Sequence, residues 1–187
     1  MREIGIEAGG HLILSCRTGQ KDAEGHFFEA RIGSLIADLT GADLEFFDML
    51  LADGIASVKA DSRAYPWNVW GEVLAPRAGT EVRAAYADQF YAGKAAAVSR
   101  SVGKGTVTYI AVETKDGALE RRLVRSVYER AGVAVEDLPR GVYLEWRDGF
   151  TVGVNYSNTP ITLSVPAAGR VLVGSNPLAP GQALVWK

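Results

Sequence analysis

The chain has 187 residues, of which 48% are hydrophobic and 22% are charged, and its formal net charge is -2. This length allows one medium domain, or a medium and a small one. The near-neutral charge excludes a basic field for nucleic acid or an anionic membrane, and no apolar run approaches the roughly 20 residues of a membrane span. The start of the chain lacks the apolar segment of a signal peptide. One cysteine excludes an internal disulfide and favours a reducing compartment, so we expect a cytoplasmic protein.

The first part of the chain predicts a short helical end followed by a buried strand. Residues 1–9 have the pattern of the last turns of a helix, which Gly9-Gly10 would terminate. The run Leu12-Ile13-Leu14 does not alternate with polar residues, which is typical of a strand covered on both faces in a parallel sheet. Open α/β sheets usually place their sites in the loop after such a strand. In this chain that loop carries Arg17, Thr18, Gln20, Lys21, Asp22 and Glu24.

The middle of the chain predicts two helices separated by short strands. Apolar spacing predicts a helix over 32–40 and a second over 116–131, the latter with its charged residues on the opposite face. A strand is expected over 45–49, a loop over 52–68, and several alternating strands from Trp70 onward. The sequence Gly103-Lys104-Gly105 predicts a hairpin turn and not a phosphate-binding loop, because no helix follows it.

The last 46 or so residues predict a small antiparallel β-sandwich. Its expected strands are residues 142–146, 150–155, 161–165, 170–173 and 183–186, separated by turns rich in Gly, Pro and Asn. Trp146 and Trp186 lie on these strands and are predicted to be core residues. The predicted domain bounds are therefore 1–135 and 140–187, joined by a linker.

Five segments resemble, in order, the β-galactosidases of glycoside hydrolase family 42. These segments are Gly9 to Asp22, Trp70-Gly71-Glu72-Val73-Leu74, residues 85–96, Gly103-Lys104-Gly105 before Tyr109-Ile110, and Gly149-Phe150 to Asn155-Tyr156-Ser157. The resemblance covers nearly the whole chain. It places residues 1–135 in the trimerisation domain and the tail in the small sandwich that closes these enzymes. The catalytic barrel, with its two catalytic carboxylates, has no counterpart here.

The resemblance implies a fold and a function. It implies an α/β fold: a partial class I amidotransferase-like, flavodoxin-like domain followed by the antiparallel β-sandwich. The implied function is that of the non-catalytic oligomerisation and C-terminal modules of a β-galactosidase, whose missing barrel hydrolyses terminal β-galactosides. About half of the family's trimerisation domain precedes Gly9, so we expect strands of another chain to pair with the open sheet edge. The expected partner is a second copy, in a dimer or trimer, or a chain that carries the catalytic barrel.

The loop after the first strand is the predicted interface. Its candidate residues are Arg17, Thr18, Lys21 and Asp22, which we expect to contact a partner and not to act in catalysis. Arginine is enriched where bidentate contacts fix a partner. Substitution of Arg17 by alanine would test this hypothesis through the solution mass.

An aromatic cluster offers an alternative function in carbohydrate binding. Tyr65, Trp67 and Trp70 fall in the predicted loop and could stack on a galactoside or a partner. The same three side chains could equally form a local core beneath a long loop. Quenching of tryptophan fluorescence by galactose or lactose would distinguish the two interpretations.

A thiol enzyme built on Cys16 is the second alternative. An amidotransferase-like nucleophile sits on a strained elbow with small neighbours, whereas Cys16 lies between Ser15 and Arg17, so a buried structural thiol is favoured. Cys16, His26, Asp22 and Glu24 have no recognised metal-ligand spacing. His11 would point to the face opposite Cys16. We therefore predict no catalytic residue, metal or cofactor in this chain, and no glycoside hydrolysis by the chain alone.

Overall fold

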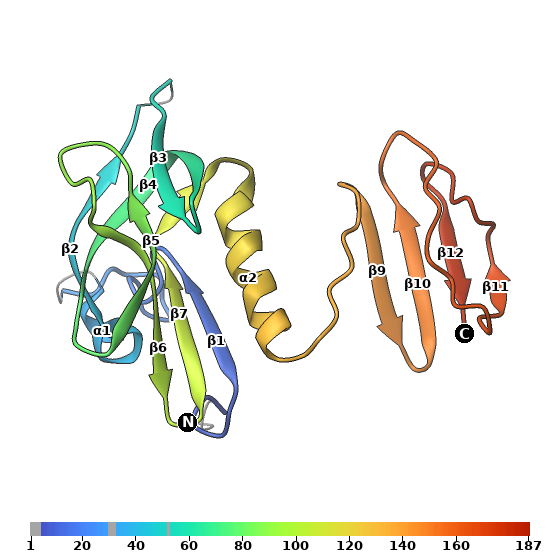
Figure 1. Cartoon of the computed structure of the whole chain (residues 1–187), viewed down its shortest axis with the longest axis horizontal. Coiled ribbons are helices and arrows are strands. Elements are labelled where there is room, and N and C mark those ends of the chain that lie inside the picture. Colours follow the sequence, from blue (N-terminus) through green and yellow to red (C-terminus); the bar gives the residue numbers. More distant parts are fainter. Residues whose placement is uncertain (1–4, 30–32, 52) are drawn as a thin grey trace. The chain divides into compact units, whose positions relative to one another are not determined.

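The computed structural model describes residues 5–29, 33–51 and 53–187 and divides into two compact units, Met1–Val133 and Ala134–Lys187 (Figure 1). Each unit is described by itself. The elements of the first unit are β1 (His11–Ser15), α1 (Ser34–Thr40), β2 (Ala42–Met49), β3 (Ala56–Ala60), β4 (Arg63–Pro76), β5 (Thr80–Tyr86), β6 (Ala95–Val102), β7 (Gly105–Ile110), β8 (Val112–Thr114), the 3-10 turn Lys115–Gly117 and α2 (Ala118–Arg130).

The predicted α/β class is wrong, because strands dominate the described part of the chain. An amidotransferase-like or flavodoxin-like domain alternates strands with helices around a parallel sheet. Here β2 to β8 follow one another without an intervening helix, and only β1 and β7 pair in parallel among the described strands. Short turns between successive strands force antiparallel pairing, since a parallel crossover needs a dozen or more residues. The strands form a mixed, mostly antiparallel sheet.

The eight-stranded sheet of the first unit curls on itself. Its order is β1-β7-β6-β5-β3-β4-β2, and β8 pairs with β4. The long strand β4 also meets β6 at Leu74 and Ala95, so β4, β3, β5 and β6 form a closed ring of pairings. β1 and β2 lie at the two ends of the strand order.

Residues 52–68 were predicted to be a loop, which is wrong. Most of this segment forms the β3–β4 hairpin, whose two-residue turn is Asp61-Ser62 with φ of 47° and 65°. Two positive φ values match the twist of the flanking strands, and aspartate tolerates this conformation better than most residues. The expected helix at the start is also wrong, since residues 5–9 form turns; residues 1–4 lie outside the described residues.

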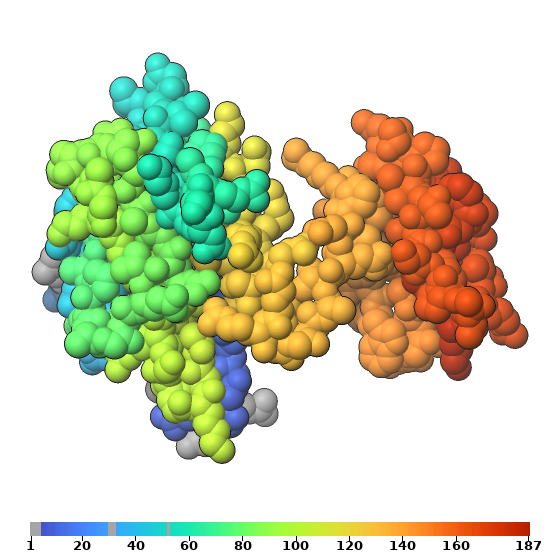
Figure 2. Space-filling view, in the orientation of Figure 1, coloured from blue at the N-terminus to red at the C-terminus, as the bar shows by residue number. Residues whose placement is uncertain are grey.

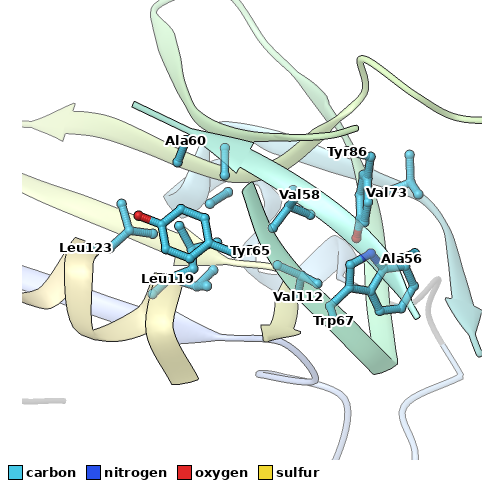
Figure 3. Close-up of a cluster of buried hydrophobic side chains, with 14 of the residues drawn as sticks. Ala56, Val58, Ala60, Tyr65, Trp67, Val73, Tyr86, Val112, Leu119 and Leu123 are labelled. Atoms are coloured by element: carbon cyan, nitrogen blue, oxygen red, sulfur yellow. The ribbon is translucent and has the colours of Figure 1, made fainter. Parts of the chain in front are cut away.

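The core of the first unit lies between the curled sheet and α2. Leu119 and Leu123 of α2 are buried and pack in one cluster with Tyr65 and Trp67 of β4, as Figure 3 shows. The apolar stripe predicted for residues 116–131 is confirmed by this helix, Ala118–Arg130. The helix predicted over 32–40 corresponds to α1, although Ile32 lies outside the described residues.

The second unit is one four-stranded antiparallel sheet. Its strands are β9 (Val142–Arg147), β10 (Phe150–Asn155), β11 (Val171–Val173) and β12 (Ala183–Trp186), in the order β11-β12-β10-β9. The strand predicted over 161–165 is reduced to an isolated bridge between Ile161 and Leu178. Trp186 is buried as predicted, whereas the prediction for Trp146 is wrong, because this side chain is 70% exposed.

Candidate functional site

A fully buried carboxylate, that of Glu72 in the middle of β4, organises the site. Its Oε1 accepts hydrogen bonds from the Arg17 backbone N–H at 2.9 Å, Trp70 Nε1 at 3.1 Å and Gln20 Nε2 at 3.3 Å. Its Oε2 accepts the hydroxyl of Tyr109. A buried carboxylate is tolerated only when such donors replace the lost water. These bonds therefore fix the loop after β1 to β4 and β7.

The backbone of Glu72 is fixed as firmly as its side chain. Its N–H donates to the carbonyl of Ala111 at 2.7 Å, and the Tyr86 hydroxyl donates to its carbonyl at 3.1 Å. Burial raises the pKa of the Tyr86 and Tyr109 hydroxyls, and the nearby Glu72 carboxylate raises them further. Both hydroxyls stay protonated and continue to act as donors at neutral pH.

Arg17, predicted at the interface, stacks on a second predicted residue. Its guanidinium lies 4.6 Å from the centre of the Trp70 ring, and the Trp70 ring stacks on Phe47 at 4.5 Å. Arg17 also approaches Glu113 at 3.9 Å. The Arg17–Trp70–Phe47 stack therefore places a cation and aromatic groups on one surface, and it covers both faces of the Trp70 indole.

The other predicted interface residues divide into two groups. The Thr18 hydroxyl donates to the Ser15 carbonyl at 2.6 Å, and Asp22 Oδ1 accepts the backbone N–H groups of residues 24 and 26, so both shape the loop from within. Lys21 is exposed and lies over the Phe27 ring at 4.9 Å. A shallow hollow of about 350 Å³ opens here, lined by Arg17, Gly19, Gln20, Lys21 and Phe27.

Tyr65 and Trp67 lie in the core. They are 5% and 0% exposed, and Figure 3 shows both rings among the buried apolar side chains of β3, β4, β8 and α2. A sugar needs an open ring face for stacking. Of the three predicted aromatic residues, only Trp70 approaches the surface.

Cys16 lies beside the Arg17 loop in an environment that disfavours a thiolate. Burial and the Glu72 carboxylate raise the pKa of Cys16 to about 11, whereas a nucleophilic thiol needs a lowered pKa. His11 Nε2 is hydrogen-bonded to the Thr108 hydroxyl at 2.8 Å, and His26 pairs with Asp22. Within residues 5–29, 33–51 and 53–187, no cluster of His, Cys, Asp or Glu could hold a metal ion.

The opposite face of β2 carries an aromatic group that the sequence analysis missed. Phe46 stacks on Phe90 at 5.6 Å, and Phe90 contacts Tyr91, whose hydroxyl donates to Asp48 at 2.6 Å. Phe90 is 87% exposed, on the loop between β5 and β6. Its signal was present in residues 85–96, one of the segments that carried the family resemblance, but no function was assigned to it.

Comparison with known proteins identifies the family of this arrangement. The β-galactosidase trimerisation domain matches residues 5–134. The chain belongs to this family. Family 42 β-galactosidases contain this domain as a non-catalytic module, as the resemblance implied.

Relatives of the trimerisation domain chain are whole β-galactosidases. β-Galactosidase BgaH of Haloferax lucentense is 33% identical over 172 residues, which cover 91% of this chain and 26% of that protein. The solved β-galactosidase of Halorubrum lacusprofundi has a TM-score of 0.81 and 28% identity, over 97% of this chain and 28% of that one. That of Rahnella sp. R3 has a TM-score of 0.79 at 24% identity, with 97% and 29% covered. The chain thus spans about a quarter of its curated relatives.

The described helices of this trimerisation domain chain were also examined for membrane spans. None of them has both the length and the apolar composition that a crossing requires.

Proposed function

We propose that this chain holds the subunits of a family 42 β-galactosidase together by binding a second copy of itself. The observation that carries the proposal is the match of the trimerisation domain to residues 5–134, nearly the whole first unit. The two surfaces of β2 support it, because exposed aromatic and arginine side chains are enriched at protein interfaces.

Arg17, Lys21 and Trp70 provide contacts with the partner in this proposal. Arg17 is held by Trp70 below it and by the backbone bond to Glu72, so little side-chain freedom is lost when a partner binds. Thr18 and Asp22 contribute by holding the loop in shape, through the bonds they make within it. The buried Tyr65 and Trp67 support the sheet beneath.

The whole protein would hydrolyse terminal β-galactosides in a catalytic barrel outside this chain. Its relatives are about four times longer and are named β-galactosidases, which supports a barrel on the same polypeptide. A cytoplasmic location is part of the proposal, supported by the single cysteine, Cys16. This chain contributes assembly and no catalytic group.

The test is the mass of the chain in solution, measured by light scattering over a range of concentrations. A stable assembly, together with no turnover of a chromogenic β-galactoside, is the expected result. A chain that remains monomeric at high micromolar concentration would refute self-association through this module. Turnover by the purified chain, lost when the preparation is repeated with a matched unrelated protein, would not fit a purely structural role either.

A further inference from the structure

Strand β2 (Ala42–Met49) presents aromatic side chains on both of its faces. Successive side chains of a strand point to opposite faces of the sheet. Phe46 faces Phe90 and Tyr91, whereas Phe47 faces Trp70 and, through it, Arg17. β2 is also at one end of the strand order, so it is an edge strand among the described strands. The first unit therefore carries two different aromatic surfaces, one on each side of the same edge.

The first surface is a rigid projection, which we call the knob, formed by Phe90 on the loop 87–94. This loop is tied down by backbone bonds: Ala87 N–H to the Ser57 carbonyl at 2.8 Å and Gly93 N–H to the Tyr86 carbonyl at 2.8 Å. Asp88 Oδ2 accepts the Ser57 N–H at 2.9 Å. Figure 2 shows this green loop at the surface of the first unit. An exposed phenylalanine on an ordered loop loses little conformational entropy on binding, as an interface anchor requires.

The second surface, which we call the socket, is the hollow of about 350 Å³ whose lining includes Arg17, Lys21 and Phe27. Its volume is within the range of pockets that enclose a small ligand, and so it can receive one aromatic ring. Phe27 is 64% exposed and offers a ring for stacking. Arg17 and Lys21 offer cations for the face of an incoming ring.

The charges around the two surfaces are opposite. Arg17 and Lys21 make the socket basic, whereas Asp48 and Asp88 flank the knob. Asp88 Oδ1 has no hydrogen-bond partner in the part of the chain that the structure describes. Socket against socket would oppose like charges, and knob against knob would do the same, whereas knob against socket brings opposite charges together.

Resting on the proposed function, we infer that copies of this chain associate head to tail, with Phe90 of one copy seated in the Arg17–Lys21–Phe27 socket of the next. A heterologous contact of this kind closes into a ring when the rotation between copies allows, as a three-fold assembly requires. A self-complementary patch would instead give a two-fold dimer. The two distinct and complementary surfaces of this chain match the first arrangement.

The test uses two variants of the full chain and their mixture. Phe90→Asp removes the knob, and a double variant, Arg17→Glu with Lys21→Glu, removes the charge of the socket. We expect each to weaken association by about 30-fold or more and to be monomeric where the wild type assembles. Mixed one to one, they retain one intact knob and one intact socket. The mixture should therefore form a heterodimer of twice the chain mass and no larger ring.

The controls separate this inference from the proposed function. Tyr128→Asp changes a side chain that is 48% exposed on α2, and it should leave the assembly intact. Circular dichroism of every variant should match the wild type. If the wild type assembles and both variants assemble equally well, or if their mixture stays monomeric, head-to-tail docking is wrong while self-association stands. If the wild type is itself monomeric, the proposed function fails, and this inference fails with it.

Discussion

Replacement of Glu72 by leucine is expected to destabilise the first unit strongly. The substitution removes the acceptor of four donors, which come from Arg17, Gln20, Trp70 and Tyr109. Gln20 and Tyr109 are buried, so each donor left unpaired costs about 1–3 kcal/mol, whereas the other two can turn to water at lower cost. Leucine burial offsets part of this loss. The net effect should be about 3–5 kcal/mol of unfolding free energy, roughly 6–20 °C in Tm for a protein of this size.

Glu72→Gln provides the matched comparison, because the amide retains one acceptor oxygen. The Tyr109 hydroxyl can rotate to accept from the new amide, so the loss should be smaller, about 1–2 kcal/mol. Glu81→Leu, at an exposed position on β5, controls for removal of a surface carboxylate. Urea unfolding followed by tryptophan fluorescence, with the α2 signal by circular dichroism, measures all three. A Glu72→Leu variant within about 0.5 kcal/mol of the wild type would refute the role assigned to this carboxylate.

Two further predictions concern Cys16 and Gly105. Because the pKa of Cys16 is raised to about 11 in the folded chain, alkylation by iodoacetamide at pH 8 should be far slower than that of free cysteine; equal rates would contradict this. The same shift stabilises the fold fully below the unfolded thiol pKa of about 8.5, and this contribution is lost as pH rises toward 11, so Cys16→Ser should flatten the alkaline arm of a pH–stability curve. Gly105→Ala would place a Cβ 2.1 Å from the Ile6 carbonyl oxygen and 2.2 Å from that of Gly10, and should lower thermal stability by about 3 kcal/mol; an unchanged Tm would show that these turns yield freely.

Local patterns predicted the elements well where side chains alone decide them. The apolar stripe ending before Gly132 predicted α2, and Phe150 to Asn155 was predicted with the bounds of β10. The predicted loop over 52–68 failed because Pro66 and the Asp61-Ser62 pair are typical of loops. Here the pair forms a hairpin turn, and Pro66 is accommodated within β4.

The fold class and the centre of the site could not be predicted in the same way. Nothing in Leu12-Ile13-Leu14 reveals that β1 pairs with β7, so a parallel sheet with helices was a reasonable but wrong extension. Glu72 is a single acidic residue in an apolar run, and its partners come from segments far apart in sequence. By contrast, Arg17 was identified from its place after the first strand, although its stacking on Trp70 needed the three-dimensional structure.

The pairing of β1 with β7 has a consequence for synthesis on the ribosome. His11 and Thr108, joined across these strands, are 97 positions apart. At about 5–20 residues per second, β1 waits roughly 5–20 seconds before its partner strand has been translated. During that interval the loop with Arg17 and Phe27 has neither the Trp70 ring nor Glu72 to hold it. The first strand made is thus among the last to be secured, and the nascent chain exposes the residues that later face the neighbouring subunit.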